Sequence, residues 1–296
     1  MKNKESGAAK KYSGFMKKVF FIAVIILLAP YFIRIFICDQ FVVPSDSMQP
    51  TLVTGDRILV NKLIAGPRIY KKFDFAKDIP LRSFRIPGIR PVRVNDVVVF
   101  NAPRGYDRDN IEFRINYVYA KRCIGTPSDS VTIRNGYFHN NRYAGPIGVQ
   151  ELQRQLSETP DSLLDSNILR AFPFDDARLG WTIRNMGPFY VPRAGVRIEL
   201  DSMNYLLYRQ VIEYETGLGL KYGGGRLLLG GEAVGEYTFC KNYYFFCGDN
   251  VFNSKDCRYL GFVPEEFIIG VVRRITYSRD YFGDNCRPGR WWKRVE

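Results

Sequence analysis

The hydrophobic residues form one unbroken run near the start of the chain. Residues 19–38 read VFFIAVIILLAPYFIRIFIC, with Arg34 as the only charged side chain. A helix of this length crosses the hydrocarbon core of a bilayer, which is about 30 Å thick. Pro30 is tolerated inside a spanning helix, and Arg34 lies near enough to one end for its guanidinium to reach the interface. The pattern predicts one N-terminal transmembrane helix.

A cleavable export signal is the alternative interpretation of this run, because basic residues precede both kinds of segment. Residues 1–18 contain six lysines and one glutamate. However, no A-x-A-like cleavage site follows the run, and the run is long for the apolar region of an export signal. We therefore expect an uncleaved anchor with its basic flank in the cytoplasm, by the positive-inside rule. No second long apolar run occurs, so the chain from about residue 39 onward should lie outside.

After the anchor, short stretches of β-branched and aromatic residues predict strands. They cover residues 57–63 (RILVNKL), 96–100 (DVVVF), 131–143 (VTIRNGYFHNNRY), 237–247 (YTFCKNYYFFC) and 266–278 (EFIIGVVRRITYS). Asn135-Gly136 predicts a hairpin with a type I′ turn, and Gly230-Gly231 predicts a second turn within 224–239. The sequence therefore predicts a mainly β protein.

A few helices interrupt this β pattern. Residues 147–172 are polar with a helical pattern, and Asp201 can cap a helix over 202–215. In that helix Tyr205, Tyr208, Val211 and Ile212 share one face. Residues 64–94, rich in Pro, Arg and Ile, predict an extended excursion rather than a linker, because apolar residues continue throughout.

The net charge of +13 raises the question of nucleic-acid binding. Outside the basic flank the charge is scattered, and neither a basic helix nor a zinc-finger or RNP pattern accompanies it. We therefore expect no nucleic-acid partner. The C-terminal residues GRWWKRVE can either rest at a membrane interface or cap the domain with their aromatic rings.

Cysteine and histidine usage excludes most metal sites. The six cysteines are Cys38, Cys123, Cys240, Cys247, Cys257 and Cys286, without C-x-x-C spacing, and His139 is the only histidine. We expect no metal and no cofactor. Cys240 and Cys247 bracket a short β segment and could form a disulfide, although the sequence does not choose among the pairings.

The single histidine also limits the hydrolytic chemistry. A Ser–His–Asp or Cys–His site needs a histidine base, and His139 lies just past a predicted hairpin turn among polar residues, where a histidine is usually solvated. Lysine is the remaining candidate base, because burial can lower the pKa of its amine by as much as about 3–5 units.

Residues 43–52 read VPSDSMQPTL, a proline-flanked stretch with serines at alternate positions. It resembles the nucleophile box of type I signal peptidases, Pro-Ser-Gly-Ser-Met-x-Pro-Thr. The resemblance implies that Ser47 is the nucleophile, and that the Ser47 backbone N–H and the Ser45 hydroxyl are the oxyanion donors. Asp46 replaces the usual glycine of that family.

Three further stretches match boxes of the same family in the same order. GDRILVNKL at 55–63 resembles its second box. YAKRCIGTPSD at 119–129 resembles Tyr-x-Lys-Arg-x-x-Gly-x-Pro-Gly-Asp, which implies Lys121 as general base, with Ser128 in place of a glycine. The alternation of residues along this stretch is what a strand needs to point a lysine inward.

GDNVFNSKDCRYLGFVP at 248–264 resembles the last box, Gly-Asp-Asn-x-x-x-Ser-x-Asp-Ser-Arg followed by Gly-Phe-Val-Pro. By this resemblance Ser254 hydrogen-bonds and orients the Lys121 amine, while Asp256 and Arg258 form a supporting ion pair. Cys257 stands in place of the usual serine and Val251 where arginine is frequent.

The resemblance also implies the organisation of the chain. We expect a mainly β protease core with an inserted α/β cap region and one transmembrane helix. The ranges are a basic tail (1–18), the anchor (19–38), the first part of the core (39–145), the insertion or cap (146–234) and the last part of the core with the C-terminal tail (235–296).

The family removes signal peptides from exported preproteins and cuts after small residues. Phe41, Val43, Pro44 and Ala120 are implied to line the shallow substrate pockets. The expected partners are exported preproteins and membrane lipid, and the expected location is the bacterial inner (plasma) membrane, single-pass, with the catalytic domain extracytoplasmic. Two alternatives stay open: a Ser–Lys protease specialised for a narrow substrate, and an inactive membrane-tethered binding module.

Overall fold

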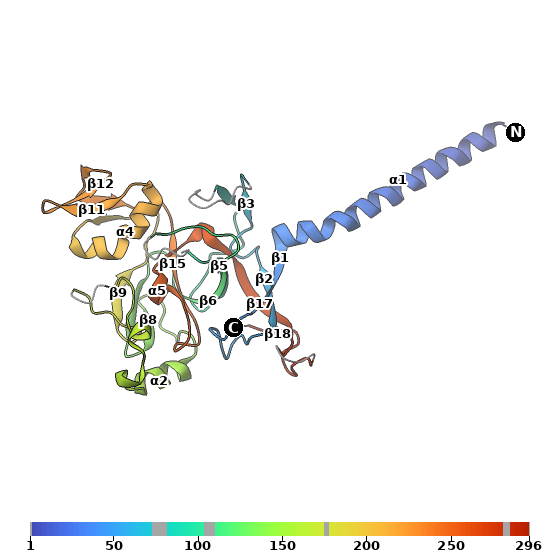
Figure 1. Ribbon diagram of the computed structural model, residues 1–296. Helices are drawn as coiled ribbons and strands as arrows, with labels where there is room; N and C mark the ends of the chain where they lie inside the picture. The colour runs from blue at the N-terminus through green and yellow to red at the C-terminus, as the bar shows by residue number, and fades with distance from the viewer. Residues whose placement is uncertain (1, 73–81, 104–109, 175–177, 281–284, 296) are drawn as a thin grey trace.

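A long N-terminal helix projects from a β-rich body (Figure 1). The computed structural model describes residues 2–72, 82–103, 110–174, 178–280 and 285–295. Helix α1 (Lys2–Phe32) continues into a π-helical turn, η1 (Ile33–Ile37). Within the segment Phe15–Ile37, an 18-residue window has a mean hydropathy of 2.6 and is not buried, and the length and composition of the segment suit a membrane span. The span thus begins four residues before the predicted run, and Cys38 already belongs to the first strand.

One antiparallel sheet forms the centre of the body. Its strand order is β1-β2-β17-β5-β6-β15-β16, and β18 pairs with the far end of β17. The strands are β1 (Cys38–Val42), β2 (Asp56–Asn61), β5 (Val97–Asn101), β6 (Val118–Gly125), β15 (Tyr243–Cys247), β16 (Val263–Pro264), β17 (Ile268–Ser278) and β18 (Lys293–Arg294). β17 pairs with β2 and β5, and β15 pairs with β6, so this sheet joins the two predicted parts of the core.

The apolar residues of β5 explain why the sheet is covered on both faces. All five residues of β5 are buried, and successive strand residues point to opposite faces. Val97 and Val99 belong to one buried cluster, and Val98 and Phe100 to another. The cluster around Val97 and Val99 also holds Met48, and therefore anchors the loop that follows β1.

The described residues also form four smaller sheets. They are β3-β4 (Arg68–Tyr70, Ser83–Arg85), β8-β7-β9 (Tyr137–Asn140, Ser130–Arg134, Met186–Tyr190), β10-β14 (Arg197–Glu199, Glu236–Thr238) and β11-β12-β13 (Leu220–Gly223, Arg226–Leu229, Glu232–Ala233). Both predicted hairpin turns are confirmed. Asn135 and Gly136 have φ values of 47° and 83°, and Gly230 and Gly231 have 60° and 97°, the positive values that such turns need.

The helices of the body are short, apart from one. They are α2 (Gln150–Glu158), α3 (Ser166–Leu169), α4 (Ser202–Thr216) and α5 (Cys257–Leu260), with 3₁₀ turns at Asp161–Leu163 and Glu265–Phe267. The predicted cap of α4 is confirmed, because Asp201 Oδ1 accepts from the Asn204 N–H at 2.7 Å. Tyr208, Val211 and Ile212 are buried as expected. Within 147–172, α2 is the main helix.

Strand pairing crosses the predicted boundary at residue 145. β9, from the predicted insertion, pairs with β7, from the first part of the core. α4 and β11–β13 lie together at one side of the body, away from α1 (Figure 1). The division into ranges stays a prediction. The excursion 64–94 contributes β3 and β4, although residues 73–81 lie outside the described part of the chain.

The C-terminal tail packs back onto the body. Arg290 donates to both carboxylate oxygens of the buried Asp56 and to the Thr51 carbonyl. Val295 is buried in the cluster that holds Met48, while the Trp291 side chain is 78% exposed. The tail therefore closes that cluster and leaves one tryptophan free to meet an external surface.

The possible Cys240–Cys247 disulfide is not formed. All six cysteines are free, and Cys247 is buried at the end of β15 whereas Cys240 is exposed. A strand of that length extends the chain by roughly 13 Å. Bridged Cα atoms lie within about 7 Å of each other. The extended conformation of β15 thus keeps the two thiols apart.

Candidate active site

The loop between β1 and β2 carries the serines of the first motif. Its two ends are tied together, because Val43 N–H donates to the Asp56 carbonyl at 2.8 Å and Gly55 N–H to the Val43 carbonyl at 2.9 Å. Inside the loop, the side chains of Met48 and Leu52 are buried in the apolar cluster. Ser47 directly precedes the first of these anchors. The loop therefore holds Ser47 at a defined place at the rim of the cluster.

Lys121 approaches that loop from β6. It lies opposite Val98 in the β5–β6 pairing, and its Nζ donates a hydrogen bond to Ser47 Oγ. Only 4% of Lys121 is exposed. Ser45 Oγ lies 3.3 Å from Ser47 Oγ on the same loop. Tertiary contacts thus bring together all three residues that the sequence singled out for this chemistry.

Burial changes the acid–base behaviour of the lysine. Loss of solvent lowers the pKa of the Lys121 amine from 10.5 to about 8. The nearby Asp256 carboxylate acts in the opposite direction and raises this pKa, whereas the Arg258 guanidinium lowers it. The two neighbours are oppositely charged, so burial decides the direction. Such an amine is partly neutral near pH 8 and can accept a proton.

Asp256 and Arg258 form a fully buried ion pair near the lysine. Arg258 Nε and one terminal nitrogen donate to the two Asp256 oxygens at 2.9 and 2.8 Å. Asp256 also accepts from the Gly248 N–H, and Arg258 donates to the Val251 carbonyl. Burial by itself raises the pKa of the Asp256 carboxyl, but the Arg258 charge and the hydrogen bonds outweigh it, so that pKa lies below its ordinary value.

The expected hydrogen bond from Ser254 to the Lys121 amine is not formed. Ser254 Oγ is buried and has no hydrogen-bond partner, whereas the amine donates to Ser47. Ser254 packs tightly against Gly248, where an added Cβ would lie 2.1 Å from Ser254 Oγ and 2.5 Å from the Ser47 carbonyl oxygen. The prediction was wrong in this contact, although Ser254 does lie beside the nucleophile segment.

A second ion pair next to the site was missed in the sequence. Arg122 follows Lys121 on β6, and its side chain donates to both Asp249 oxygens at 2.7 Å. Thr51 of the nucleophile loop also donates to Asp249. This network ties β6, the loop and the segment after β15 together. Arg122 and Asp249 each lie within a predicted site motif, which was the available signal, but the sequence does not reveal that these two residues pair.

A groove of about 440 Å³ opens beside Ser47 and Lys121. All four predicted pocket residues line it, namely Phe41, Val43, Pro44 and Ala120. The remaining lining includes Ile58, Val99 and Val118, so its surface is mainly apolar. β15 pairs with β6 only over residues 122–125, which leaves residues 118–121 without a strand on that side among the described residues. A peptide in extended conformation fits beside such an edge.

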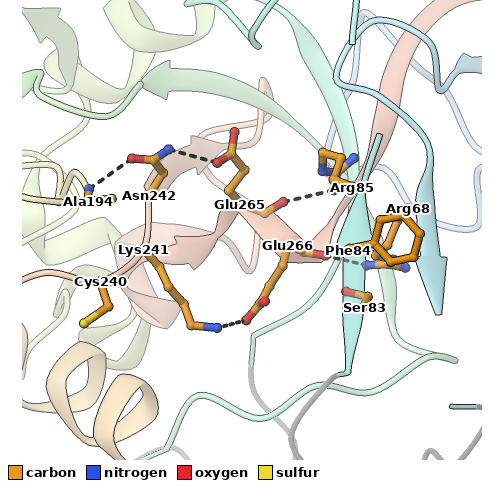
Figure 2. Close-up of a pocket in the computed structure, with 10 residues that line it drawn as sticks. All are labelled: Arg68, Ser83, Phe84, Arg85, Ala194, Cys240, Lys241, Asn242, Glu265 and Glu266. Carbon is orange, nitrogen blue, oxygen red and sulfur yellow. Dashed lines mark hydrogen bonds and ion pairs between the residues drawn. The ribbon is translucent and has the colours of Figure 1, made fainter. Parts of the chain in front are cut away.

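Figure 2 shows a second pocket, of about 260 Å³, beside β4 and the start of β17. Its polar groups bind one another. Lys241 Nζ lies 2.6 Å from a Glu266 oxygen, Arg85 donates to the Glu265 and Ile268 carbonyls, and Asn242 donates to the Glu265 carboxylate at 2.9 Å. These contacts attach the β3-β4 hairpin to the body. The pocket therefore has a structural explanation.

Other candidate nucleophiles and bases are unsuited to the groove. His139 is exposed on β8. Burial raises the pKa of the Cys123 and Cys247 thiols well above its ordinary value, so neither thiol is a ready nucleophile. At the groove, Ser47 and Lys121 are joined by a hydrogen bond, and the pKa of the lysine amine is lowered.

Comparison with known proteins gives relatives along most of the chain. Signal peptidase I of Buchnera aphidicola subsp. Baizongia pistaciae is 28% identical over 252 residues, which cover 83% of this chain and 72% of the relative. Signal peptidase I of Aquifex aeolicus is 27% identical over 265 residues, covering 89% and 85%. The enzyme of that name from Pseudomonas aeruginosa is 26% identical over 271 residues, covering 88% and 71%.

The family described as signal peptidase, peptidase S26, matches residues 15–170 and 230–277. The matched ranges contain the apolar helix, the nucleophile loop, β6 and the segment 248–264, and they leave out α4 and most of β11–β13. Because these ranges make up more than half of the chain, the protein belongs to the signal peptidase family, peptidase S26.

Proposed function

We propose that this protein is a membrane-anchored signal peptidase, which removes N-terminal signal peptides from exported preproteins by Ser–Lys acyl transfer. The observation that carries the proposal is the hydrogen bond between a buried lysine amine and Ser47 Oγ, at the wall of an apolar groove. The family membership supports the peptidase activity. The dyad roles rest on the geometry.

In the first half of the reaction, neutral Lys121 accepts the proton of Ser47 Oγ as the oxygen attacks the scissile carbonyl carbon. The tetrahedral intermediate collapses when Lys121 returns that proton to the leaving amine. This step leaves an acyl ester on Ser47 and a neutral lysine. In the second half, Lys121 takes a proton from water, the hydroxide attacks the ester, and Ser47 regains its proton as the carboxylic acid leaves.

Two donors on the nucleophile loop are suited to hold the oxyanion. The Ser47 backbone N–H donates to no other group within the described part of the chain, and the Ser45 hydroxyl lies next to Ser47 Oγ. A donor of this kind, aimed at developing negative charge, contributes about 2.7–4 kcal/mol to the transition state. We assign the oxyanion hole to these two groups.

The residues behind the lysine have supporting roles in this proposal. The Asp256–Arg258 pair sets two opposite charges near the amine. Ser254, whose hydroxyl has no hydrogen-bond partner, is available to receive or donate a hydrogen bond when substrate displaces the Ser47–Lys121 contact.

Substrate recognition follows from the groove. An extended signal-peptide segment would lie along residues 118–121 of β6, pair through its backbone, and place small side chains against Phe41, Val43, Pro44 and Ala120. The basic residues before the apolar helix favour a cytoplasmic N-terminus in the bacterial plasma membrane. The β-rich body would then face the extracytoplasmic side, next to membrane lipid, where exported preproteins emerge.

The function is tested by incubating the purified full chain, in detergent, with several unrelated exported precursors. We expect one cut in each, after small residues at the first and third positions before the bond, as mapped by mass spectrometry of both products. Cleavage of a single precursor would instead identify a narrow processing protease. Absence of cleavage in all of them would identify an inactive binding module.

The pKa of Lys121 predicts the pH dependence of cleavage. Since the neutral amine is the base and its pKa is about 8, kcat/KM should rise with pH and level off above that value. Below it, the neutral fraction falls tenfold per pH unit, so the rate at pH 6 should be about 100-fold under the plateau. The measurement is a pH–rate profile on one precursor. A profile flat down to pH 5 would contradict a lysine base.

A further inference from the structure

Hydrogen bonds to its carbonyl oxygen fix the orientation of the peptide unit between Asp46 and Ser47. The Asp46 carbonyl accepts from the Gln49 N–H at 2.9 Å and from Asn250 Nδ2 at 3.3 Å. In a trans peptide the C=O and N–H bonds lie in one plane and point in opposite directions. Fixing the Asp46 carbonyl therefore also fixes the direction of the Ser47 N–H.

The turn that supplies Asn250 makes two further contacts with the same loop. The Asn250 backbone N–H donates to the Ser47 carbonyl at 3.2 Å. Asn253 Nδ2 donates to the two oxygens of the Asp46 side chain at 3.2 and 3.0 Å. The turn is itself closed by a hydrogen bond from the Asn253 N–H to the Asn250 carbonyl. Hydrogen bonds thus hold the loop at Asp46, before the nucleophile, and at the carbonyl group of Ser47, after it.

The Asp46 carboxylate accepts the hydrogen bonds from Asn253. The glycine that is usual at this position of the motif has no carboxylate. Its φ angle is negative, since it is not among the residues with positive φ, so the backbone here does not require glycine. Asp46 also lines the groove together with Asn253. An acidic side chain at this place therefore has a structural role that the sequence did not reveal.

We propose that Asp46, Asn250 and Asn253 are positioning residues of the oxyanion hole. They orient the peptide unit 46–47 so that the Ser47 N–H points into the groove, where the carbonyl oxygen of the substrate gains negative charge. The inference rests on the proposed function, because it assigns a direction to a donor of that reaction. None of the three residues exchanges a proton with the substrate.

The Asp46–Asn253 contact can be broken and rebuilt by exchanging the two side chains. Asn253→Asp sets two carboxylates against each other, whereas the double variant Asp46→Asn/Asn253→Asp restores an amide facing a carboxylate and the original net charge. We expect Asn253→Asp to lower kcat by about tenfold or more. Removal of a whole oxyanion donor lowers kcat by about 10²–10³-fold, so a misdirected donor should lose part of that factor. The double variant should recover most of that loss, with KM little changed in both.

Rates are measured at pH 9.5, on the expected plateau, so that a changed pKa of Lys121 does not enter. The matched control is Asn141→Asp, because Asn141 Oδ1 already acts as an acceptor, from the Ser130 N–H, and lies outside the groove lining. This control should keep the wild-type kcat.

Binding of two ligands gives a second measurement. In Asn253→Asp, the affinity for a peptide aldehyde should fall together with kcat, because the aldehyde adduct places an oxygen in the oxyanion hole. The affinity of this variant for the product peptide should stay unchanged.

A wild-type kcat in Asn253→Asp, or a double variant as slow as the single one, would overturn the inference. Equal loss of affinity for aldehyde and product peptide would also overturn it, because a general loosening of the loop affects both. If Asn253→Asp does not fold, Asn250→Ala serves the same test. It removes the side-chain donor to Asp46 and keeps the backbone N–H that binds the Ser47 carbonyl.

Failure of this inference is distinguishable from failure of the proposed function. If variants of Ser47 and Lys121 lose activity while Asn253→Asp keeps it, the dyad stands and the positioning role falls. If the Ser47 and Lys121 variants stay active, the proposed function and the positioning role are both refuted.

Discussion

Replacing Lys121 with methionine is expected to lower kcat/KM for precursor cleavage by at least about 10³-fold, because it removes the general base. Methionine is unbranched, apolar and of similar length, so it suits a site where the lysine is 4% exposed. The Nζ makes its hydrogen bond to Ser47 Oγ, so the variant loses the proton acceptor with little change in packing. The measurement is processing of an exported precursor by the full chain in detergent.

Two controls sharpen this prediction. Lys221→Met, at an exposed position of β11, should cleave at the wild-type rate. Ser47→Ala should be as inactive as Lys121→Met, and the double variant no worse than either, because residues that act as one unit are not additive. Normal processing by Ser47→Ala or by a Lys121 variant would refute the assigned dyad.

Replacing Arg258 with methionine is expected to destabilise the fold by about 3–5 kcal/mol, because it leaves the Asp256 carboxylate buried without its partner. Both side chains are 0% exposed, and the guanidinium supplies two hydrogen bonds to the carboxylate. The free energy of unfolding is measured by urea titration of the full chain in detergent. The double variant Asp256→Asn/Arg258→Met should recover part of the loss, since no charge is then left unpaired.

The same variant has a second readout in the folded fraction. Arg258 lowers the pKa of Lys121, and Asp256 raises it. Removing Arg258 takes away one of the effects that lower the pKa and leaves the opposing Asp256 charge in place, so the midpoint of the pH–rate profile should move to higher pH. An unchanged midpoint together with unchanged stability would mean that the ion pair does not support the site.

Local signals in the sequence identified several elements correctly. The apolar run predicted the long apolar helix α1, and Asn135-Gly136 and Gly230-Gly231 predicted turns whose positive φ values few other residues tolerate. Asp201 predicted the start of α4 because its carboxylate can bind a free N–H of the first turn. In each case, one continuous stretch of the chain contains the physical cause.

Contacts between distant segments were not readable in this way. Arg122 and Asp249 pair across 127 positions, and nothing near either residue in the chain indicates its partner. Cys240 and Cys247 are close in sequence but are separated by the extended β15. The expected Ser254–Lys121 hydrogen bond is absent: the lysine amine donates to Ser47, and Ser254 Oγ has no hydrogen-bond partner.

The sequence by itself determined the apolar N-terminal helix, the turns and the helix cap, and through family resemblance it singled out Ser47 and Lys121. Only the tertiary structure decided that these two side chains meet across 74 positions, that burial lowers the pKa of the amine to about 8, and which polar groups hold the loop around Ser47. The physical reason is that turn and helix preferences act between neighbours in the chain. Desolvation and long-range hydrogen bonds exist only after β5, β6 and the loop have packed together.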